Sequence, residues 1–320
     1  MQLAIRDFNI ISAEAFVPKN VMQQIGIFTL QQFSAGPFKV EAGARYEHTK
    51  ADADASATIG TPDYKGHFDA YSGSIGLSYA ITPDIRVGLS GSHTERAPSA
   101  EELFANGPHA GTQAFEIGNP AFKKEISNGV EASLRGSSAG YSFSLATYYS
   151  HFRNYIYETQ TGTIEDGLAV FQFLQASANY YGIEAEANVR LFKVGDVAFN
   201  ADVLGDYTRA TIVGNGNVPR IPALRLLGGL TASSPRIDGR AEVEWVDSQK
   251  RVTAFETPTK GYTMVNASIV LRPFRDSDAT SIVLSANNIF DVEARRHASF
   301  QKDYAPLAGR DFRISARVKF

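Results

Sequence analysis

The sequence contains no cysteine, which excludes a disulfide framework and a thiolate metal site. It also lacks any apolar run of the roughly 18 residues that a membrane-spanning helix needs. The formal net charge is only -3, so no electrostatic footprint indicates a nucleic-acid partner. The first residues lack the basic stretch and long apolar core of a secretory signal. These absences disfavour a helical membrane protein, a disulfide-stapled scaffold and a nucleic-acid binder.

No catalytic motif is present either. The sequence has no Gly-x-Ser-x-Gly elbow, no His-Glu-x-x-His and no phosphate-binding Gly-Lys-Ser/Thr, so we expect no enzyme. Aromatic residues and glycine are plentiful instead, with 21 Phe, 14 Tyr and 27 Gly but one Trp. This composition is typical of many short strands bordered by aromatic girdles.

Apolar and polar residues alternate along the last segment of the chain. The apolar set is Phe312, Ile314, Ala316, Val318 and Phe320. A period of two places alternate residues on opposite faces of a strand. The same pattern recurs in about fourteen segments of roughly 9–15 residues, which is long for globular strands but suits tilted membrane strands.

The connections between these segments alternate between short and long. Short connections are expected near residues 34–37, 82–84, 136–140, 193–196, 234–238 and 275–278. Long ones are expected near residues 10–20, 52–66, 97–122, 155–176, 214–217, 251–260 and 291–307. Outer-membrane barrels have short periplasmic turns and longer extracellular loops. The sequence therefore predicts an all-β fold, an antiparallel transmembrane β-barrel of about fourteen strands, with Phe320 at the periplasmic rim.

Three segments resemble TonB-dependent receptors, the energised importers of the bacterial outer membrane. Residues 96–104 (RAPSAEELF), with 118–120 (GNP) and 124–125 (KE), resemble their mid-barrel box. Residues 287–291 (NNIFD) resemble the box before their final loop, and the strand ending in Phe320 resembles the signal read by the barrel-assembly machinery. The stretch from Gly107 to Asn119 is most similar to the zinc-import branch of the family.

The resemblance implies that residues 1–320 are the C-terminal portion of a barrel of about twenty-two strands, with the first strands, plug domain and TonB box missing. It implies an outer-membrane receptor for a scarce nutrient, either zinc or an iron–siderophore, as transported cargo and without a tightly bound cofactor. The implied partners are outer-membrane lipid, the barrel-assembly machinery and, through the missing plug, the TonB complex. Two alternatives stay open: a passive fourteen-stranded pore and a non-transporting truncated barrel.

Histidine and carboxylate residues on the extracellular side are the candidate metal ligands, because neutral imidazole with carboxylate suits zinc. All six histidines fall on that side: His48, His67, His93, His109, His151 and His297. The carboxylates there include Asp52, Asp54, Asp69, Glu95 and Glu116. His48, His67, His93 and His151 share parity with lipid-facing residues, which favours an outer rim. His109, in the longest loop next to Gly107 and Pro108, is a candidate ligand together with Glu116; the alternative is that it only supports a turn.

Two further groups of side chains have simple structural interpretations. The aromatic residues Tyr148, Tyr149, Phe152, Tyr155, Tyr157, Tyr180 and Tyr181 are interpreted as the upper girdle, at the level of the lipid headgroups. The lumen-facing arginines, such as Arg45 and Arg313, are expected to pair with plug carboxylates.

Overall fold

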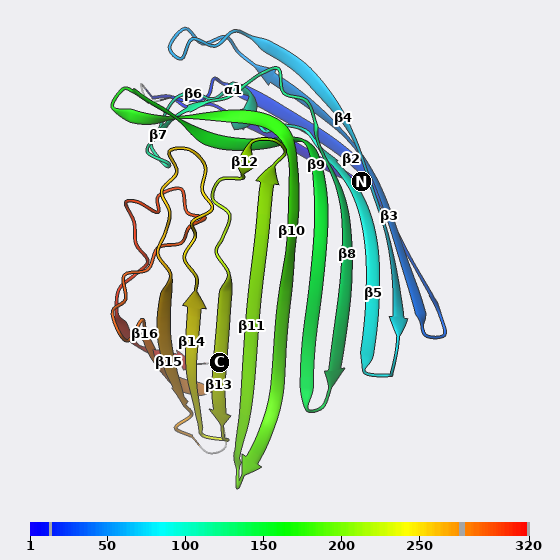
Figure 1. Ribbon diagram of the computed structural model, residues 1–320, viewed down its shortest axis with the longest axis vertical. Coiled ribbons are helices and arrows are strands. Elements are labelled where there is room, and N and C mark those ends of the chain that lie inside the picture. Colours follow the sequence, from blue (N-terminus) through cyan, green and yellow to red (C-terminus); the bar gives the residue numbers. More distant parts are fainter. Residues whose placement is uncertain (13–14, 275–278, 319–320) are drawn as a thin grey trace.

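The computed structural model describes residues 1–12, 15–274 and 279–318. Nearly all of these residues form one strongly curved sheet (Figure 1). In the described part, fourteen strands of seven or more residues make up this wall, in agreement with the sequence. They are β1 (Gln2–Phe8), β2 (Asn20–Ala35), β3 (Phe38–Ala53), β4 (Tyr64–Ala80), β5 (Ile85–Arg96), β8 (Glu125–Ser138), β9 (Tyr141–Glu165), β10 (Leu168–Val194), β11 (Val197–Ile212), β13 (Arg225–Ser233), β14 (Ile237–Val246), β15 (Tyr262–Leu271), β16 (Thr280–Asn287) and β17 (Asp311–Val318).

Each wall strand pairs antiparallel with the next one along the chain, so the order in space follows the order in sequence. Tight turns join the strands at one end, where Gly36 and Gly195 take the positive φ values of 55° and 57°. Longer connections gather at the other end, and they carry helix α1 (Ala100–Phe104) and the short strands β6 (Asn106–His109), β7 (Ala114–Ile117) and β12 (Gly216–Asn217). The turn expected at residues 275–278 and the terminal Phe320 lie outside the described residues.

The prediction of a long loop at residues 155–176 is wrong. β9 and β10 continue through this region as a long hairpin that bends over the top of the wall (Figure 1). β7 adds to it in parallel, with Phe115 opposite Val170. The hairpin is stabilised because its apolar side chains are covered: Ile156 and Tyr157 are 6% and 8% exposed. These contacts come from distant parts of the chain, so local alternation could not indicate them.

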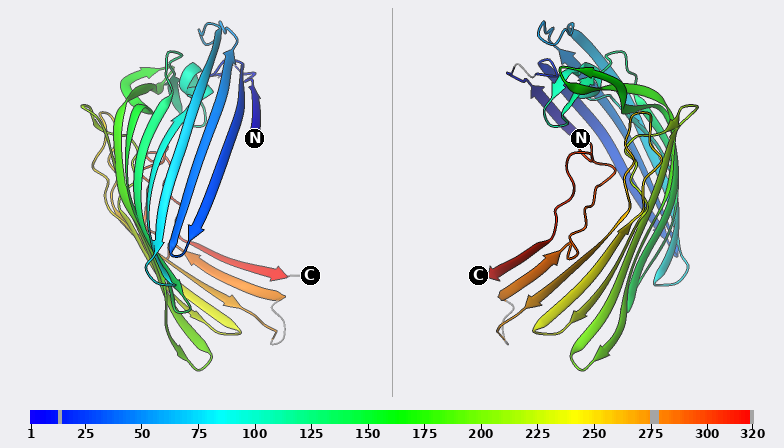
Figure 2. Two further views of the ribbon diagram at one scale, coloured as in Figure 1. Left: turned by 90° about the vertical axis from the view of Figure 1, so that its right-hand side faces the viewer. Right: turned by 60° about the vertical axis from the view of Figure 1, so that its left-hand side comes forward.

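The two outermost strands lie apart. β1 has its register with β2 and β17 has its register with β16, and Figure 2 shows a wide gap between the two edges. Among the described residues the wall therefore does not close into the fourteen-stranded ring that one of the alternatives requires.

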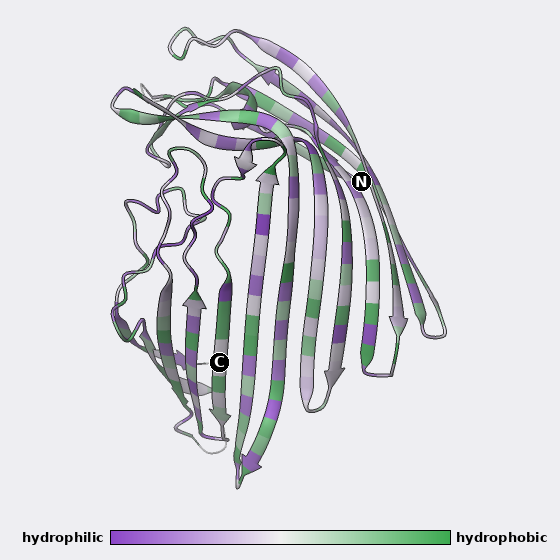
Figure 3. Ribbon diagram, viewed as in Figure 1, coloured by the Kyte–Doolittle hydropathy of each residue, from purple (hydrophilic) through white to green (hydrophobic). Residues whose placement is uncertain are grey.

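The convex face of the wall is apolar and uncovered. On β4, Ile75, Leu77 and Tyr79 are 62%, 48% and 40% exposed, and they alternate with serine and glycine residues on the concave side. The resulting bands of hydropathy are visible along the strands in Figure 3. Soluble proteins rarely expose an apolar surface of this extent, whereas a barrel turns it toward lipid. The buried core lies at the loop end instead, around Val17 and Leu103. No helix in the described ranges is long and apolar enough to cross a membrane.

Aromatic side chains mark the upper border of the apolar face. Tyr46 and Tyr71 are directly opposed on β3 and β4, and Tyr149 and Tyr181 are opposed on β9 and β10. All four are exposed, at 37%, 59%, 46% and 40%. Tyr149 and Tyr181 thus lie on the exposed outer face, where a girdle requires them.

The other aromatic residues that the sequence assigned to the girdle face the opposite side of the wall, so this part of the prediction is wrong. The Tyr155 and Tyr180 hydroxyls are 2.6 Å apart, and the Tyr148 hydroxyl contacts Thr208 at 2.8 Å. Phe152 packs against the rings of Tyr155 and Tyr180. Phe152, Tyr155, Tyr157 and Tyr180 form an inner aromatic cluster beneath the loops. Alternation points Tyr148, Phe152 and Tyr180 inward. Tyr155 and Tyr157 reach the same side because β9 is irregular at Asn154, which has a φ of 55°.

Candidate functional site

The segment between β5 and β8 builds the platform of the site. Helix α1 begins with a capping box: the Ser99 side chain accepts from the Glu102 backbone N–H at 3.2 Å, and the Glu102 carboxylate accepts from the Ser99 N–H at 2.7 Å. The Arg96 guanidinium donates to Glu102 at 2.8 Å and to Glu125 at 3.2 Å. These bonds hold the start of the loop against the end of β5 and the beginning of β8.

The helix then positions the strand that carries His109. Leu103 is 1% exposed and belongs to the same buried cluster as Phe16. The backbone N–H of Asn106, the first residue of β6, donates to the Phe16 carbonyl at 2.8 Å. As a result the Phe16 ring lies parallel to the His109 imidazole, with centroids 4.0 Å apart.

His109 and Glu116 are brought together, as the sequence predicts. They stand on paired strands, and the His109 Nδ1 lies 2.8 Å from Glu116 Oε1. The same oxygen accepts from the Thr112 hydroxyl at 2.6 Å. Glu116 is 4% exposed, while the His109 side chain is 32% exposed. Because Glu116 accepts a hydrogen bond from the N–H at Nδ1, Nε2 is the ring nitrogen with a free lone pair.

A second buried carboxylate lies close to this pair. Glu158 is 8% exposed, and one of its oxygens accepts from the Arg220 guanidinium at 3.2 Å. Its other oxygen, Oε1, is buried and has no hydrogen-bond partner in the described part of the chain. Burial, followed by repulsion from Glu116, raises the pKa of Glu158 to about 7. The local field therefore favours either a proton or a cation at this carboxyl group.

A third cluster joins the later loops. Glu256 Oε1 accepts from Lys302 Nζ at 2.9 Å and lies 3.1 Å from His297 Nε2. All three side chains are at most 8% exposed. Burial alone would raise the pKa of Glu256, but the bonds from His297 and Lys302 outweigh it and hold the pKa well below its usual range. His297 thus belongs to a buried cluster with Glu256 and Lys302.

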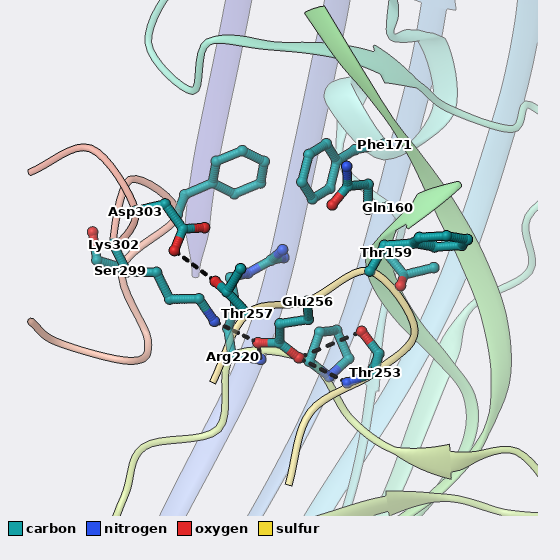
Figure 4. A pocket seen from close by; sticks show the side chains of 13 residues that line it. Thr159, Gln160, Phe171, Arg220, Thr253, Glu256, Thr257, Ser299, Lys302 and Asp303 are labelled. Carbon is teal, nitrogen blue, oxygen red and sulfur yellow. Dashed lines mark hydrogen bonds and ion pairs between the residues drawn. The ribbon is translucent and has the colours of Figure 1, made fainter. Parts of the chain in front are cut away.

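Residues of the second and third clusters line a small cavity between the loops, whereas His109 and Glu116 lie outside its lining (Figure 4). Its lining includes Phe171, Arg220, Glu256 and Lys302, with about 50 Å³ of space for the centres of water molecules. A single water needs about 10–15 Å³ on this measure, so the cavity holds a few waters or an ion but not a chelate. The Arg220 guanidinium, which donates to Glu158 at 3.2 Å, also lies over the Phe300 ring, with 4.9 Å from its central carbon to the ring centroid.

The remaining histidines lie elsewhere, on the outer side of the wall. His48 Nδ1 is 2.8 Å from Asp69 Oδ1, and its ring stacks at 5.9 Å on His67. His93 and His151 each contact an asparagine on the next strand at 2.8 Å. These histidines share the parity of the exposed apolar residues on their strands, which agrees with the expected outer rim.

Two of the expected carboxylates on this side are already paired. Asp69 bonds to His48, and Glu95 accepts from Lys124 at 2.6 Å. In the described ranges no group of three or more His, Asp or Glu side chains is arranged to hold a metal ion. The site therefore offers His109 with Glu116, and the nearby Glu158 is a residue that sequence reasoning missed.

The fold and the loop-end site are those of an outer-membrane-type β-barrel wall. Residues 3–289 match the family described as TonB dependent receptor-like, beta-barrel, and the chain belongs to this family. The family is one of bacterial outer-membrane proteins.

Solved structures show the same fold at low sequence identity. The copper transporter OprC superposes with a TM-score of 0.77 at 16% identity, over 94% of this chain and 50% of that one. The FrpB iron transporter from Neisseria meningitidis gives 0.71 at 15% identity, over 95% and 46%. The ferric yersiniabactin uptake receptor FyuA from Yersinia pestis gives 0.64 at 19% identity, over 94% and 46%. The chain spans about half the length of these structures.

Proposed function

We propose that residues 1–320 supply wall and extracellular loops to an outer-membrane receptor that takes up a metal-containing nutrient, energised through TonB as part of a longer receptor. The observation that carries this proposal is the His109–Glu116 pair, with Nδ1 and Oε1 2.8 Å apart at the loop end of the wall. A histidine whose second nitrogen is held by a carboxylate is the usual arrangement of a zinc-binding imidazole.

The pair also limits how the metal is held. Zinc prefers four ligands, and the His109–Glu116 pair offers at most two. The captured ion therefore keeps water or other ligands of its own while His109 Nε2 binds it. Zinc suits this imidazole–carboxylate set, and an iron–siderophore is the second candidate cargo. The cavity between the loops, with about 50 Å³ of room, is too small for such a chelate, so a chelate would have to bind on the open concave side of the loops.

A metal titration of the refolded chain tests the proposal. We expect His109→Ala to weaken zinc binding by about 10–100-fold, since it removes the ligand. His67→Ala is the matched control, because His67 is an exposed histidine on the outward side of β4 and contacts His48 rather than His109 or Glu116. The zinc affinity of this variant should equal that of the wild type. Unchanged zinc affinity in His109→Ala would exclude this site.

Electrical recording separates the receptor from the passive pore. A pore would give steady single-channel conductance of uniform size in planar bilayers, whereas a receptor wall whose lumen is otherwise filled would not. A barrel without cargo would bind neither zinc nor an iron chelate in the titration above.

A further inference from the structure

A row of polar side chains crosses the convex face of the wall just above the tyrosine girdle. It runs over four neighbouring strands, with His93 on β5, Asn128 on β8, His151 on β9 and Asn179 on β10. His93 is opposite Asn128, Asn128 is opposite His151, and His151 is opposite Asn179. We call these four residues the outer polar row.

Hydrogen bonds within the row fix how each group is presented. The Nδ1 atoms of His93 and His151 lie 2.8 Å from the amide oxygens of Asn128 and Asn179. An amide oxygen can only accept, so each Nδ1 must donate. This leaves Nε2 of His151 as an acceptor and the amide NH₂ groups as donors, with no further partner for them among the described residues. Donors and acceptors thus alternate along the row.

Aromatic and charged groups border the row. Tyr149 and Tyr181, one outward position below on their strands, are 46% and 40% exposed, and the Tyr149 hydroxyl donates to Asn179 at 3.0 Å. Arg153, one outward position above His151, is exposed. A similar histidine and tyrosine pair stands on β3 and β4, where a carboxylate replaces the amide: the His48 Nδ1 and the Tyr46 hydroxyl both bond to Asp69.

The geometry points to a binding surface for the phosphorylated sugar headgroup of a lipid in the outer leaflet. Sugar hydroxyls both donate and accept, which matches the alternating amide and imidazole groups of the row. The exposed tyrosine rings lie at the level of lipid headgroups, where they can pack against a sugar ring. The Arg153 guanidinium supplies the charge that pairs with a phosphate. This surface is separate from the cargo site, because it faces outward from the wall.

Lipid binding to the full chain in lauryldimethylamine oxide micelles tests the inference, with lipid A and phosphatidylglycerol as the two probes in native mass spectrometry. We expect the wild type to bind lipid A about tenfold more tightly than phosphatidylglycerol, equivalent to ~1.4 kcal/mol. The double variant Asn128→Leu/His151→Leu should lose this preference. Thr29→Leu/Gln31→Leu, which changes outward polar residues on β2, should keep it.

Two results would overturn the inference. Equal binding of both lipids to the wild type would show that the surface does not recognise a sugar. An unchanged lipid A preference in Asn128→Leu/His151→Leu, with the β-sheet circular dichroism of the wild type, would show that the preference arises elsewhere. Should the double variant fail to refold, Asn128→Ala, which removes one exposed amide, must still lower the preference at least threefold.

Discussion

The imidazole of His109 donates from Nδ1 to the carboxylate of Glu116 across 2.8 Å, and this bond determines which nitrogen faces the loop-end space. The bond also gives His109 and Glu116 different roles, whereas the sequence suggested that both are metal ligands. In the proposed site, Nε2 of His109 is the ligand atom, while Glu116 orients the ring and fixes its tautomer.

Glu116→Gln should therefore weaken zinc binding without abolishing it. The amide keeps the volume of the carboxylate and can still accept from Nδ1, but it removes the negative charge that makes the imidazole a stronger base. We expect about a tenfold loss of zinc affinity, the lower end of the range for such orienting partners. Zinc titration measures it. A loss as large as that of His109→Ala would instead identify Glu116 as a direct ligand.

The stability of the β9–β10 hairpin should depend on the protonation of Glu158. Its pKa in the folded protein is about 7, above the usual value of about 4.3 for an unfolded chain. The folded state therefore binds the proton more tightly, so stability is highest below about pH 4.3 and falls as the pH rises toward 7. The loss is on the order of 3 kcal/mol, since each pKa unit corresponds to about 1.4 kcal/mol.

Hydrogen exchange of the hairpin amides at several pH values measures this effect, after correction for intrinsic rates. In Glu158→Gln the protection of the hairpin should no longer decline between about pH 4.5 and pH 7. An identical decline in the variant would show that another group is responsible.

Gly118 should not tolerate a side chain. A Cβ at this position would lie 2.8 Å from the Glu102 carbonyl oxygen and 2.9 Å from the Ala105 nitrogen, both of them backbone atoms that cannot move aside. We expect Gly118→Ala to destabilise the loop platform by about 1–3 kcal/mol. Gly140→Ala is the control, because nothing lies within 4 Å of a Cβ there. Thermal unfolding of both variants measures the difference, and equal midpoints would contradict the close approach.

The wall of the protein could be predicted from its sequence, because alternation is a local property of each strand. Phe312 and Ile314 on β17 stand opposite Ala286 and Leu284 on β16, so they continue the apolar face of the neighbouring strands, as predicted. The same rule, applied strictly, would have separated Tyr148 from Tyr149. Assigning both to one girdle ignored the inversion of the side chain at each residue.

The loop end could be predicted only in part. His109 and Glu116 were accessible to sequence reasoning because they stand on the two strands of one short hairpin, seven residues apart. Glu256, His297 and Lys302 come together from two different loops, and no local pattern indicates that contact. The only available signal was that all these residues lie on the extracellular side.

Site-directed spin labelling tests the membrane orientation of the wall most directly. The chain has no cysteine, so each introduced cysteine is a unique attachment site. Labels at positions 74, 75, 76 and 77 of β4 in lipid vesicles should alternate, with oxygen favoured at Ile75→Cys and Leu77→Cys and a water-soluble nickel complex favoured at Ser74→Cys and Gly76→Cys. Equal access of the nickel complex to all four positions would contradict a lipid-facing convex surface.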